Sequence, residues 1–271
     1  MSAVPIMALA ACAAEPTQTS TSIGTIITYN GMSLNGMSLN GMSLNGMSLN
    51  GMSLNGMSLN GTGTDGSVLE GMDLIGAHLV ALLEDGVTLE VRIDDIDPLT
   101  GANADVLAYA LSAHIDGGWQ PLCGVASDGS ARRAIAVPGV WAAETAAWSD
   151  PGDRFTFACR DASIAKCVEL GYKSWHGFGD HQHACVRMLR ADYCGDGVSH
   201  TADGTLINVY DSAGVQTDDA AWPVDAEWGP DGALCVNHHR GTVPPPCYAE
   251  KFSATCGSFA SGALLIDEYA P

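Results

Sequence analysis

Six consecutive copies of the pentapeptide GMSLN occupy residues 31–60 without a substitution. A period of five residues is too short for helical or ankyrin-type repeats, whose units need roughly 20 to 50 residues. It suits a β-solenoid, in which each pentad forms one side of a coil and stacked coils pair through their backbones. Glycine and asparagine tolerate the left-handed backbone of a corner, and Met and Leu two positions apart face the same side of an extended segment. The alternative is an uncharged, flexible spacer.

The five-residue register continues beyond the identical copies. Leucine recurs at every fifth residue up to Leu59, and the same register resumes at Leu69 and runs to Leu79. This arrangement resembles the pentapeptide-repeat family, whose central Leu or Phe faces the inside of the coil. The residue two positions earlier is small in that family and is methionine in every GMSLN copy here. We expect a short pentapeptide-type β-solenoid over residues 31–81, capped by the domain that follows.

Residues 1–12, MSAVPIMALAAC, predict a lipoprotein-type export signal. Their last four residues, Leu-Ala-Ala-Cys, resemble a bacterial lipobox, which predicts Cys12 as the lipidated residue. No Lys or Arg precedes the apolar run, so we expect that Met1 lies inside a longer signal. Residues 13–30 follow as a tether rich in Thr and Ser. The alternative is an apolar tail that contains the lipobox residues by coincidence.

The charge of the chain is −20 and is unevenly distributed. Before Asp65 the only charged side chain is Glu15, so residues 65–271 carry 30 acidic against 11 basic side chains. Such a body repels nucleic acid and anionic lipid headgroups. We therefore expect no nucleic-acid partner, and contact with a membrane through the lipid anchor only.

Eight of the nine cysteines lie in the body of the chain. An even number in an exported chain predicts four disulfides formed in an oxidising compartment, although the sequence leaves their pairing open. Close C-x-x-C pairs are absent, which disfavours a zinc site of four cysteines. The disulfide candidates are Cys123, Cys159, Cys167, Cys185, Cys194, Cys235, Cys247 and Cys256.

Residues 82–271 have the pattern of a mixed globular domain. A Gly-Pro-Asp-Gly turn predicts a hairpin between residues 226–228 and 233–237. We predict an α+β, strand-dominated, disulfide-rich domain, preceded by the short pentapeptide-type β-solenoid. The other expected strands are residues 87–93, 106–114, 133–137, 154–159 and 205–210, and the expected helices are residues 162–170 and 183–190.

The centre of this domain contains a distinctive motif and several ordered flanking segments. The motif is Ala191, Asp192, Tyr193, Cys194, Gly195, Asp196 and Gly197. Its flanks are FTFACR (155–160), AKC (165–167), GYKSW (171–175), CVRMLR (185–190), SHTADGT (199–205) and INVYD (207–211). Together they resemble the ADYC domain, found in exported proteins, chiefly of myxobacteria, over roughly residues 85–256. The resemblance implies an exported domain and implies no reaction.

The motif itself favours a structural role. After a helix over residues 183–190, Asp192 would end the helix, Gly195 would take a left-handed cap, and Cys194 would fix the turn through a disulfide. Tyr193 would bury its ring with its hydroxyl hydrogen-bonded.

Catalytic interpretations compete with this one. A Cys-His nucleophile would need a free thiol at Cys185 or Cys194 beside an imidazole, whereas bridged cysteines are expected in an exported chain. An extracellular hydrolase would use Asp192, Asp196 and His200. No G-x-S-x-G, H-E-x-x-H or phosphate-loop motif occurs.

Two kinds of metal site are open. If residues 181–183 are extended, His181 and His183 lie on one face and could chelate Cu²⁺ or Zn²⁺, with His238 or His239 as a third ligand. Two acidic loops offer oxygen ligands for Ca²⁺ without the ordered spacing of an EF-hand. Histidines without metal, and aspartates that cap helices and turns, are the alternatives. The acidic loops contain Asp192, Asp196 and Asp203, and Asp94, Asp95, Asp97, Asn103 and Asp105.

The sequence predicts an exported, lipid-anchored protein of the outer membrane or cell surface, with a periplasmic or secreted protein as the alternative. We expect it to bind an envelope or extracellular partner or to have a structural role, with no required cofactor. The competing hypothesis is a self-modifying or metal-dependent enzyme that acts on its own GMSLN repeats, with a metal at His181 and His183.

Overall fold

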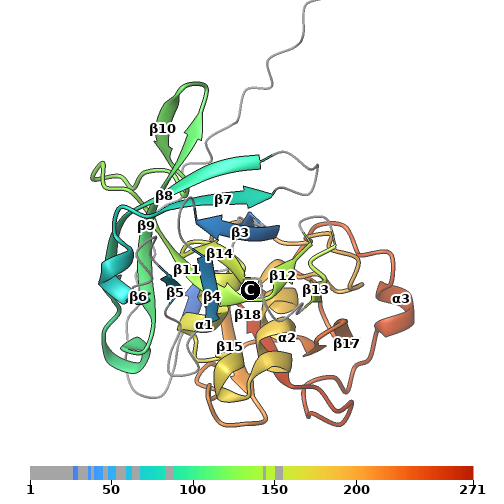
Figure 1. The fold of residues 1–271 in the computed structure, drawn as a ribbon. Helices are drawn as coiled ribbons and strands as arrows, with labels where there is room; N and C mark the ends of the chain where they lie inside the picture. Colours follow the sequence, from blue (N-terminus) through green and yellow to red (C-terminus); the bar gives the residue numbers. More distant parts are fainter. Residues whose placement is uncertain are drawn as a thin grey trace, which may run out of the picture.

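A computed structural model of the chain shows a large sheet, a smaller sheet and a pair of helices between them (Figure 1). The export signal, the tether and most of the repeats, including Cys12, lie outside the residues that the structure describes. Those residues are 27–29, 36–37, 40–44, 48–52, 59–62, 68–82, 88–142, 145–149 and 155–270.

The large sheet is antiparallel and has the order β2-β14-β11-β9-β8-β7-β3, with β10 added beside β9. Alternate residues of its strands enter two different cores: Ala134 and Ala136 face one core, and Ile135 and Val137 face the other. At one end of the sheet β3 also contacts β14, so the two ends lie close together. The strands are β2 Gly36–Met37, β3 Asn40–Leu44, β7 His78–Leu82, β8 Thr88–Pro98, β9 Leu107–Ile115, β10 Gly118–Pro121, β11 Arg133–Pro138 and β14 Phe155–Cys159.

The smaller sheet is also antiparallel and has the order β1-β15-β18-β16-β17. Its last strand in sequence, β18, lies in the middle, so the sheet is complete only when the C-terminal residues have joined it. The predicted hairpin is present as β16 and β17, paired from Ala226 with Val236 to Gly229 with Gly232. The strands are β1 Ile27–Tyr29, β15 Leu206–Asp211, β16 Val224–Gly229, β17 Gly232–Val236 and β18 Leu265–Tyr269.

Two helices join the sheets. Helix α1 (Ser163–Glu169) packs on β11 and β14, and helix α2 (Gly179–Arg190) packs on β16, β17 and β18. The disulfide between Cys167 and Cys185 ties the two helices together. Short elements complete the body: β12 Val140–Trp141, β13 Trp148–Ser149, α3 Tyr248–Lys251, and the 3₁₀ helices η2 Gly101–Asn103 and η3 Ser174–His176. The predicted α+β, strand-dominated class is confirmed.

The described part of the pentad array forms antiparallel strands and a 3₁₀ turn. Strands β4 (Ser48–Met52), β5 (Leu59–Thr62) and β6 (Val68–Glu70) make a three-stranded antiparallel sheet, and η1 (Gly71–Leu74) follows. Coils of a β-solenoid would instead pair in parallel. Among the described residues no solenoid is present, and the remaining pentads lie outside them.

Individual pentad residues behave partly as expected. Gly71 and Gly76 take left-handed conformations, with φ of 52° and 87°, as predicted for corners. The expectation that Met and Leu share a face is wrong at the described pentad: Met72 is 51% exposed and Leu74 is fully buried. The reason is that this pentad forms a 3₁₀ helix rather than an extended segment.

All eight cysteines of the body are paired. Their Cα atoms lie 5.5 to 5.9 Å apart, which is usual for disulfides. Four disulfides indicate an extracytoplasmic, oxidising location. None of the helices in the described part of the chain has the length and apolar character of a membrane span. The pairs are Cys123–Cys159, Cys167–Cys185, Cys194–Cys247 and Cys235–Cys256.

Candidate functional site

The Ala191–Gly197 motif directly follows helix α2 and turns the chain toward the smaller sheet. Ala191 ends the helix in a left-handed conformation with φ of 51°, so the cap is one residue before Asp192 and not at Gly195 as expected. Asp192 is fully buried and forms an ion pair with Arg187 of the helix. Its carboxylate also accepts the backbone N–H groups of Asp196 at 3.1 Å and Gly197 at 3.0 Å. These contacts fix the loop to the end of the helix.

Gly195 is the position in this loop that requires glycine. Its φ is 74°, and a Cβ atom built there would lie 1.9 Å from the carbonyl oxygen of Asp231. The motif loop and the β16–β17 turn therefore touch through their backbones. The disulfide between Cys194 and Cys247 holds the same loop from its other side.

Tyr193 carries the motif into the core. Its ring is fully buried and stacks on Trp228, with ring centroids 5.2 Å apart. Its hydroxyl donates to Asp225 Oδ1 at 2.7 Å and accepts the backbone N–H of Arg240 at 3.0 Å. The predicted burial of this tyrosine with a hydrogen-bonded hydroxyl is present in the structure.

A buried ion network surrounds that hydroxyl, and we call Asp225, Arg240 and Asp267 the buried triad. Arg240 Nε lies 2.5 Å from Asp225 Oδ2, and Arg240 Nη2 lies 2.5 Å from Asp267 Oδ2. All three side chains have zero exposure. Trp228 Nε1 donates to Asp267 at 2.6 Å, and Arg240 also donates to the carbonyl of Met188 at 2.8 Å. The triad thus joins β16, β18 and helix α2.

The electrostatics of the triad follow from its burial. One guanidinium faces two carboxylates, and all three side chains have zero exposure, so bulk solvent does not screen the repulsion between the carboxylates. Burial raises the pKa of Asp267 well above its usual value, and the Asp225 carboxylate adds to this rise against the opposing charge of Arg240. The Asp267 carboxyl therefore holds a proton more readily than a free aspartic acid does.

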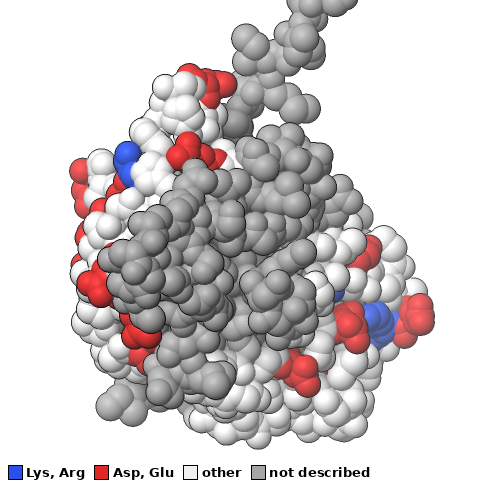
Figure 2. All heavy atoms as spheres, in the orientation of Figure 1, with Lys and Arg blue, Asp and Glu red and all other residues white. Residues whose placement is uncertain are grey.

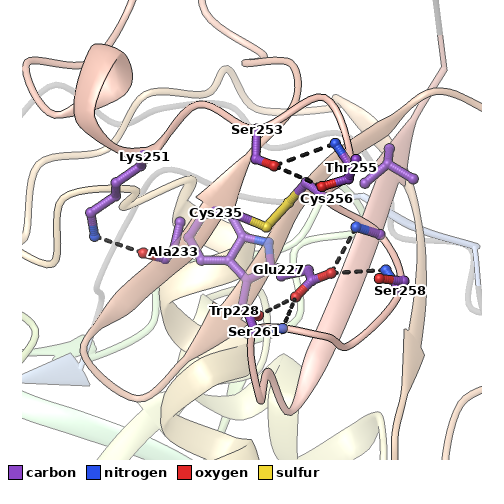
Figure 3. The surroundings of a disulfide bond; sticks show 12 residues. Glu227, Trp228, Ala233, Cys235, Lys251, Ser253, Thr255, Cys256, Ser258 and Ser261 are labelled. Atoms are coloured by element: carbon purple, nitrogen blue, oxygen red, sulfur yellow. Dashed lines mark hydrogen bonds between the residues drawn. A yellow bond between two sulfur atoms is a disulfide. The ribbon is translucent and has the colours of Figure 1, made fainter.

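A second carboxylate, Glu227, lies beside the disulfide between Cys235 and Cys256 (Figure 3). Its Oε1 accepts the backbone N–H groups of Gly257 at 2.7 Å and Ser258 at 2.8 Å, and Ser261 donates its hydroxyl to Oε2. Burial raises the pKa of Glu227, but these hydrogen bonds outweigh burial and lower it.

Glu227, Cys235 and Cys256 are the one group in the described part of the chain whose possible ligand atoms lie close enough together to share a metal ion. Both sulfurs are consumed in the disulfide between Cys235 and Cys256, and Glu227 is surrounded by donors. The group stabilises a loop and offers no open ligand position for a cation.

The predicted metal pair at His181 and His183 is contradicted by the fold. Both residues lie in helix α2, where positions two apart point about 200° away from each other. His183 packs between Trp141 and Trp148, with centroids 5.1 and 4.5 Å away. His181 packs in a different place, against Phe178. Burial lowers the pKa of His183 to about 4, so the ring is neutral at neutral pH.

The first predicted Ca²⁺ loop is occupied by basic side chains. Arg133 Nη2 lies 2.6 Å from carboxylate oxygens of both Asp95 and Asp97. Asp94 pairs with Arg92 at 2.5 Å. These cations take the place that a calcium ion would need.

The remaining residues of that loop also have partners in the protein. Asp105 forms an ion pair with Lys173 and accepts from Trp175 Nε1 at 3.2 Å. Burial raises the pKa of Asp105, but its bonds to Lys173 and Trp175 outweigh burial and lower it. Asn103 donates its side-chain amide to the carbonyl of Glu169 at 3.0 Å. The Asp94–Asp105 loop is therefore a set of ion pairs and caps, as in the alternative interpretation.

The second acidic loop and the hydrolase hypothesis fail for a related reason. Asp192 is buried against Arg187, and Asp196 accepts the backbone N–H of Val198 at 3.0 Å in a local turn. Asp203 acts electrostatically on Lys166 of helix α1. The structure does not bring the proposed trio of Asp192, Asp196 and His200 into one open site.

The thiol hypothesis is excluded in this structure because Cys185 and Cys194 are both bridged. The buried triad and the position of Glu227 were not predicted from the sequence. A usable signal was present: Asp225 and Glu227 alternate with apolar residues in the short strand VDAEWG, and LIDEY of β18 also contains acidic residues, here adjacent to each other. Charges inside such strands indicate either a solvated face or a paired, buried one, and the former is the more common outcome.

Comparison with known families agrees with the motif. The sequence model of the ADYC domain family matches residues 71–242, more than half of the chain. This protein belongs to the ADYC domain family. No curated protein and no solved structure matched the chain. The match begins and ends earlier than the quoted motifs suggested, and it excludes Asp267. Since β18 lies in the middle of the smaller sheet, the folded body extends beyond the matched residues.

Proposed function

We propose that this protein is an exported, lipid-anchored component of the cell envelope, in which the ADYC domain is a binding or structural module. The observation that carries the proposal is the orientation of the motif. The carboxylate of Asp192 and the hydroxyl of Tyr193 point inward and are bonded to protein groups, so neither is presented to a substrate. Groups that are bonded and fully buried stabilise a fold and are poorly placed for catalysis.

Charge and disulfides support the location. Four disulfides suit the periplasm or the cell surface. On the face shown in Figure 2, Asp and Glu outnumber Lys and Arg among the described residues. Such a surface is repelled by anionic lipid, so a covalent anchor at Cys12 is the expected means of membrane attachment. The residues between Cys12 and strand β1 (Ile27–Tyr29) would then link the anchor to the folded body.

The anchor is tested by expressing the full chain in a bacterial host that processes lipoproteins. We expect the mature protein in the membrane fraction, beginning with an acylated Cys12 by intact mass. The matched control, Cys12→Ser, should appear unacylated in the soluble periplasmic fraction. Membrane association of both proteins, or an unmodified Cys12 in the mature wild type, would contradict the anchor.

The same mass measurement separates the binding module from the self-modifying enzyme. An enzyme acting on its own repeats would leave GMSLN peptides altered or missing, whereas a binding module leaves them intact. The helical placement of His181 and His183 argues against a metal centre made by these two residues. Altered repeats that persist in a His183→Ala variant would require a different catalytic centre.

A further inference from the structure

The last GMSLN copy is part of the folded body. Its leucine, Leu59, is 1% exposed and belongs to the second core, together with Leu74, Leu79, Tyr109 and Phe157. The backbone N–H of Leu59 donates to the Tyr109 hydroxyl at 3.3 Å. We call the position that Leu59 fills in this core the leucine seat.

The seat lies in a completed hydrophobic cluster. Tyr109 packs against Phe157 with centroids 5.3 Å apart, and β5, which begins at Leu59, contacts η1, which ends at Leu74. Burial raises the pKa of Tyr109 to about 12, which keeps its hydroxyl protonated and able to hold the strand. An empty seat would leave a cavity in the core of the large sheet.

We infer that the leucine seat accepts any of the six GMSLN copies, so that the array is a row of equivalent ligands for one internal binding site. The five copies before the last have the same sequence as the one that is seated. Moving the chain by five residues therefore places an identical Met-Ser-Leu-Asn-Gly segment in the seat. Along the shifted chain, the first residue that differs from the present one is at the position of Thr62, which Met57 would then occupy.

The connection to the rest of the domain permits this shift. Residues 63–67 separate β5 from β6, and a shift by one copy inserts five more residues into that connection. Loop-closure entropy grows slowly: each doubling of loop length changes the equilibrium constant by roughly threefold. Strands with weakly specified register are prone to such slippage. Strands β2, β3 and β4 are built from the same pentads and would shift with the seated copy, so the exchange of Thr62 for methionine is the first change of side chain.

The shift would change the length of chain between β1 and the seat. Each copy that moves past the seat adds or removes five residues, which span at most about 17 Å when extended. Strand β1 (Ile27–Tyr29) is paired in the smaller sheet, so the shift would be taken up within the folded body. The seat therefore does not depend on the lipid anchor.

The test measures thermal unfolding of the oxidised full chain in four variants. Leu59→Ala removes the seated leucine and leaves five substitutes, so we expect the midpoint to fall by only about 1 °C. Leu74→Ala is the matched control, because this buried leucine of the same core has no identical neighbours, and we expect a fall of roughly 5 to 15 °C.

The other two variants test the array directly. Replacing the five upstream leucines by alanine while keeping Leu59 should leave the midpoint unchanged. Replacing all six should lower it as much as Leu74→Ala does, or prevent folding altogether. The upstream set is Leu34, Leu39, Leu44, Leu49 and Leu54.

Two results would overturn the inference. If Leu59→Ala alone is as destabilising as replacement of all six leucines, the seat belongs to the last copy only. If replacement of all six leaves the midpoint unchanged, no GMSLN leucine fills the core. Failure of the sixfold variant to fold, while Leu59→Ala folds normally, supports the inference as strongly as a large shift does.

Discussion

Removal of the guanidinium of the buried triad is the most informative perturbation of this fold. Arg240→Met keeps an unbranched side chain but leaves Asp225 and Asp267 facing each other without a cation. Both carboxylates have zero exposure and lie 2.5 Å from the arginine, so neither can turn to solvent without local unfolding. The Tyr193 hydroxyl also loses the ordered surroundings that fix the motif.

Two independent arguments give the size of the effect. Breaking a buried ion pair by removing one partner costs about 3 to 5 kcal/mol. Alternatively, the buried site can hold one more proton. Keeping a carboxyl with an ordinary pKa of about 3.9 neutral at pH 7 costs roughly 4 kcal/mol, at about 1.4 kcal/mol for each pH unit. The ranges agree. We expect Arg240→Met to lower the free energy of unfolding by about 4 kcal/mol at pH 7, out of the roughly 5 to 15 kcal/mol usual for a domain.

The proton also gives the variant a characteristic pH dependence. Its folded state binds a proton that the unfolded chain releases above about pH 4, so the raised carboxyl pKa stabilises the fold at low pH and this stabilisation is lost as pH rises. Relative to wild type, the variant should regain about 1.4 kcal/mol for each unit that pH falls from 7 toward 5.

Urea unfolding with intact disulfides, followed by tryptophan fluorescence at pH 7, 6 and 5, measures both quantities. Asp267→Asn is the control, since it removes a carboxylate and not the cation: we expect a loss of about 1 to 2 kcal/mol. This loss should not shrink as pH falls from 7 to 5, because the raised pKa of Asp267 stabilises only the wild type at low pH. The reasoning is refuted if Arg240→Met costs less than about 1 kcal/mol at pH 7, or if its loss stays the same as the pH falls.

Three further predictions concern the rest of the body. Replacing both Cys167 and Cys185 by serine removes the disulfide between α1 and α2, whose sequence separation is 18, and should lower the free energy of unfolding by about 3 kcal/mol. Thermal unfolding beside wild type measures this loss, and an unchanged midpoint would mean that the helices are held by packing alone. Glu227→Gln should lower the free energy of unfolding by about 1 to 3 kcal/mol at pH 7. Because hydrogen bonds outweigh burial and lower the pKa of Glu227, this loss should shrink as pH falls below about 4, and a loss that stays constant would show that the charge of the Glu227 carboxylate does not stabilise the fold. Asp192→Asn, which keeps the shape but weakens the pair with Arg187, should accelerate amide exchange in the motif loop, whereas unchanged protection would show that the loop is fixed by its disulfide instead.

The elements of the domain could be predicted from sequence because their signals are local. Successive side chains of strand β11 (Arg133–Pro138) face two cores in alternation, and the strand predicted over residues 133–137 differs from β11 by one residue. The histidine prediction failed for the same local reason: a helix that begins at Gly179 instead of 183 separates two side chains that an extended segment would have brought together. A shift of one helical turn at an element boundary was enough to remove a metal site.

By itself the sequence determined the family, the number of disulfides, the oxidising compartment and the α+β class, because motif order, cysteine count and hydrophobic period do not depend on long-range contacts. Only the tertiary structure decided the disulfide pairing and the burial of Asp225, Arg240 and Asp267. These three residues come together because β18 lies next to β16 in the smaller sheet, and strand order across such distances in sequence is set by the packing of the whole core. The same packing turns Leu59, one of six identical leucines, into a core residue.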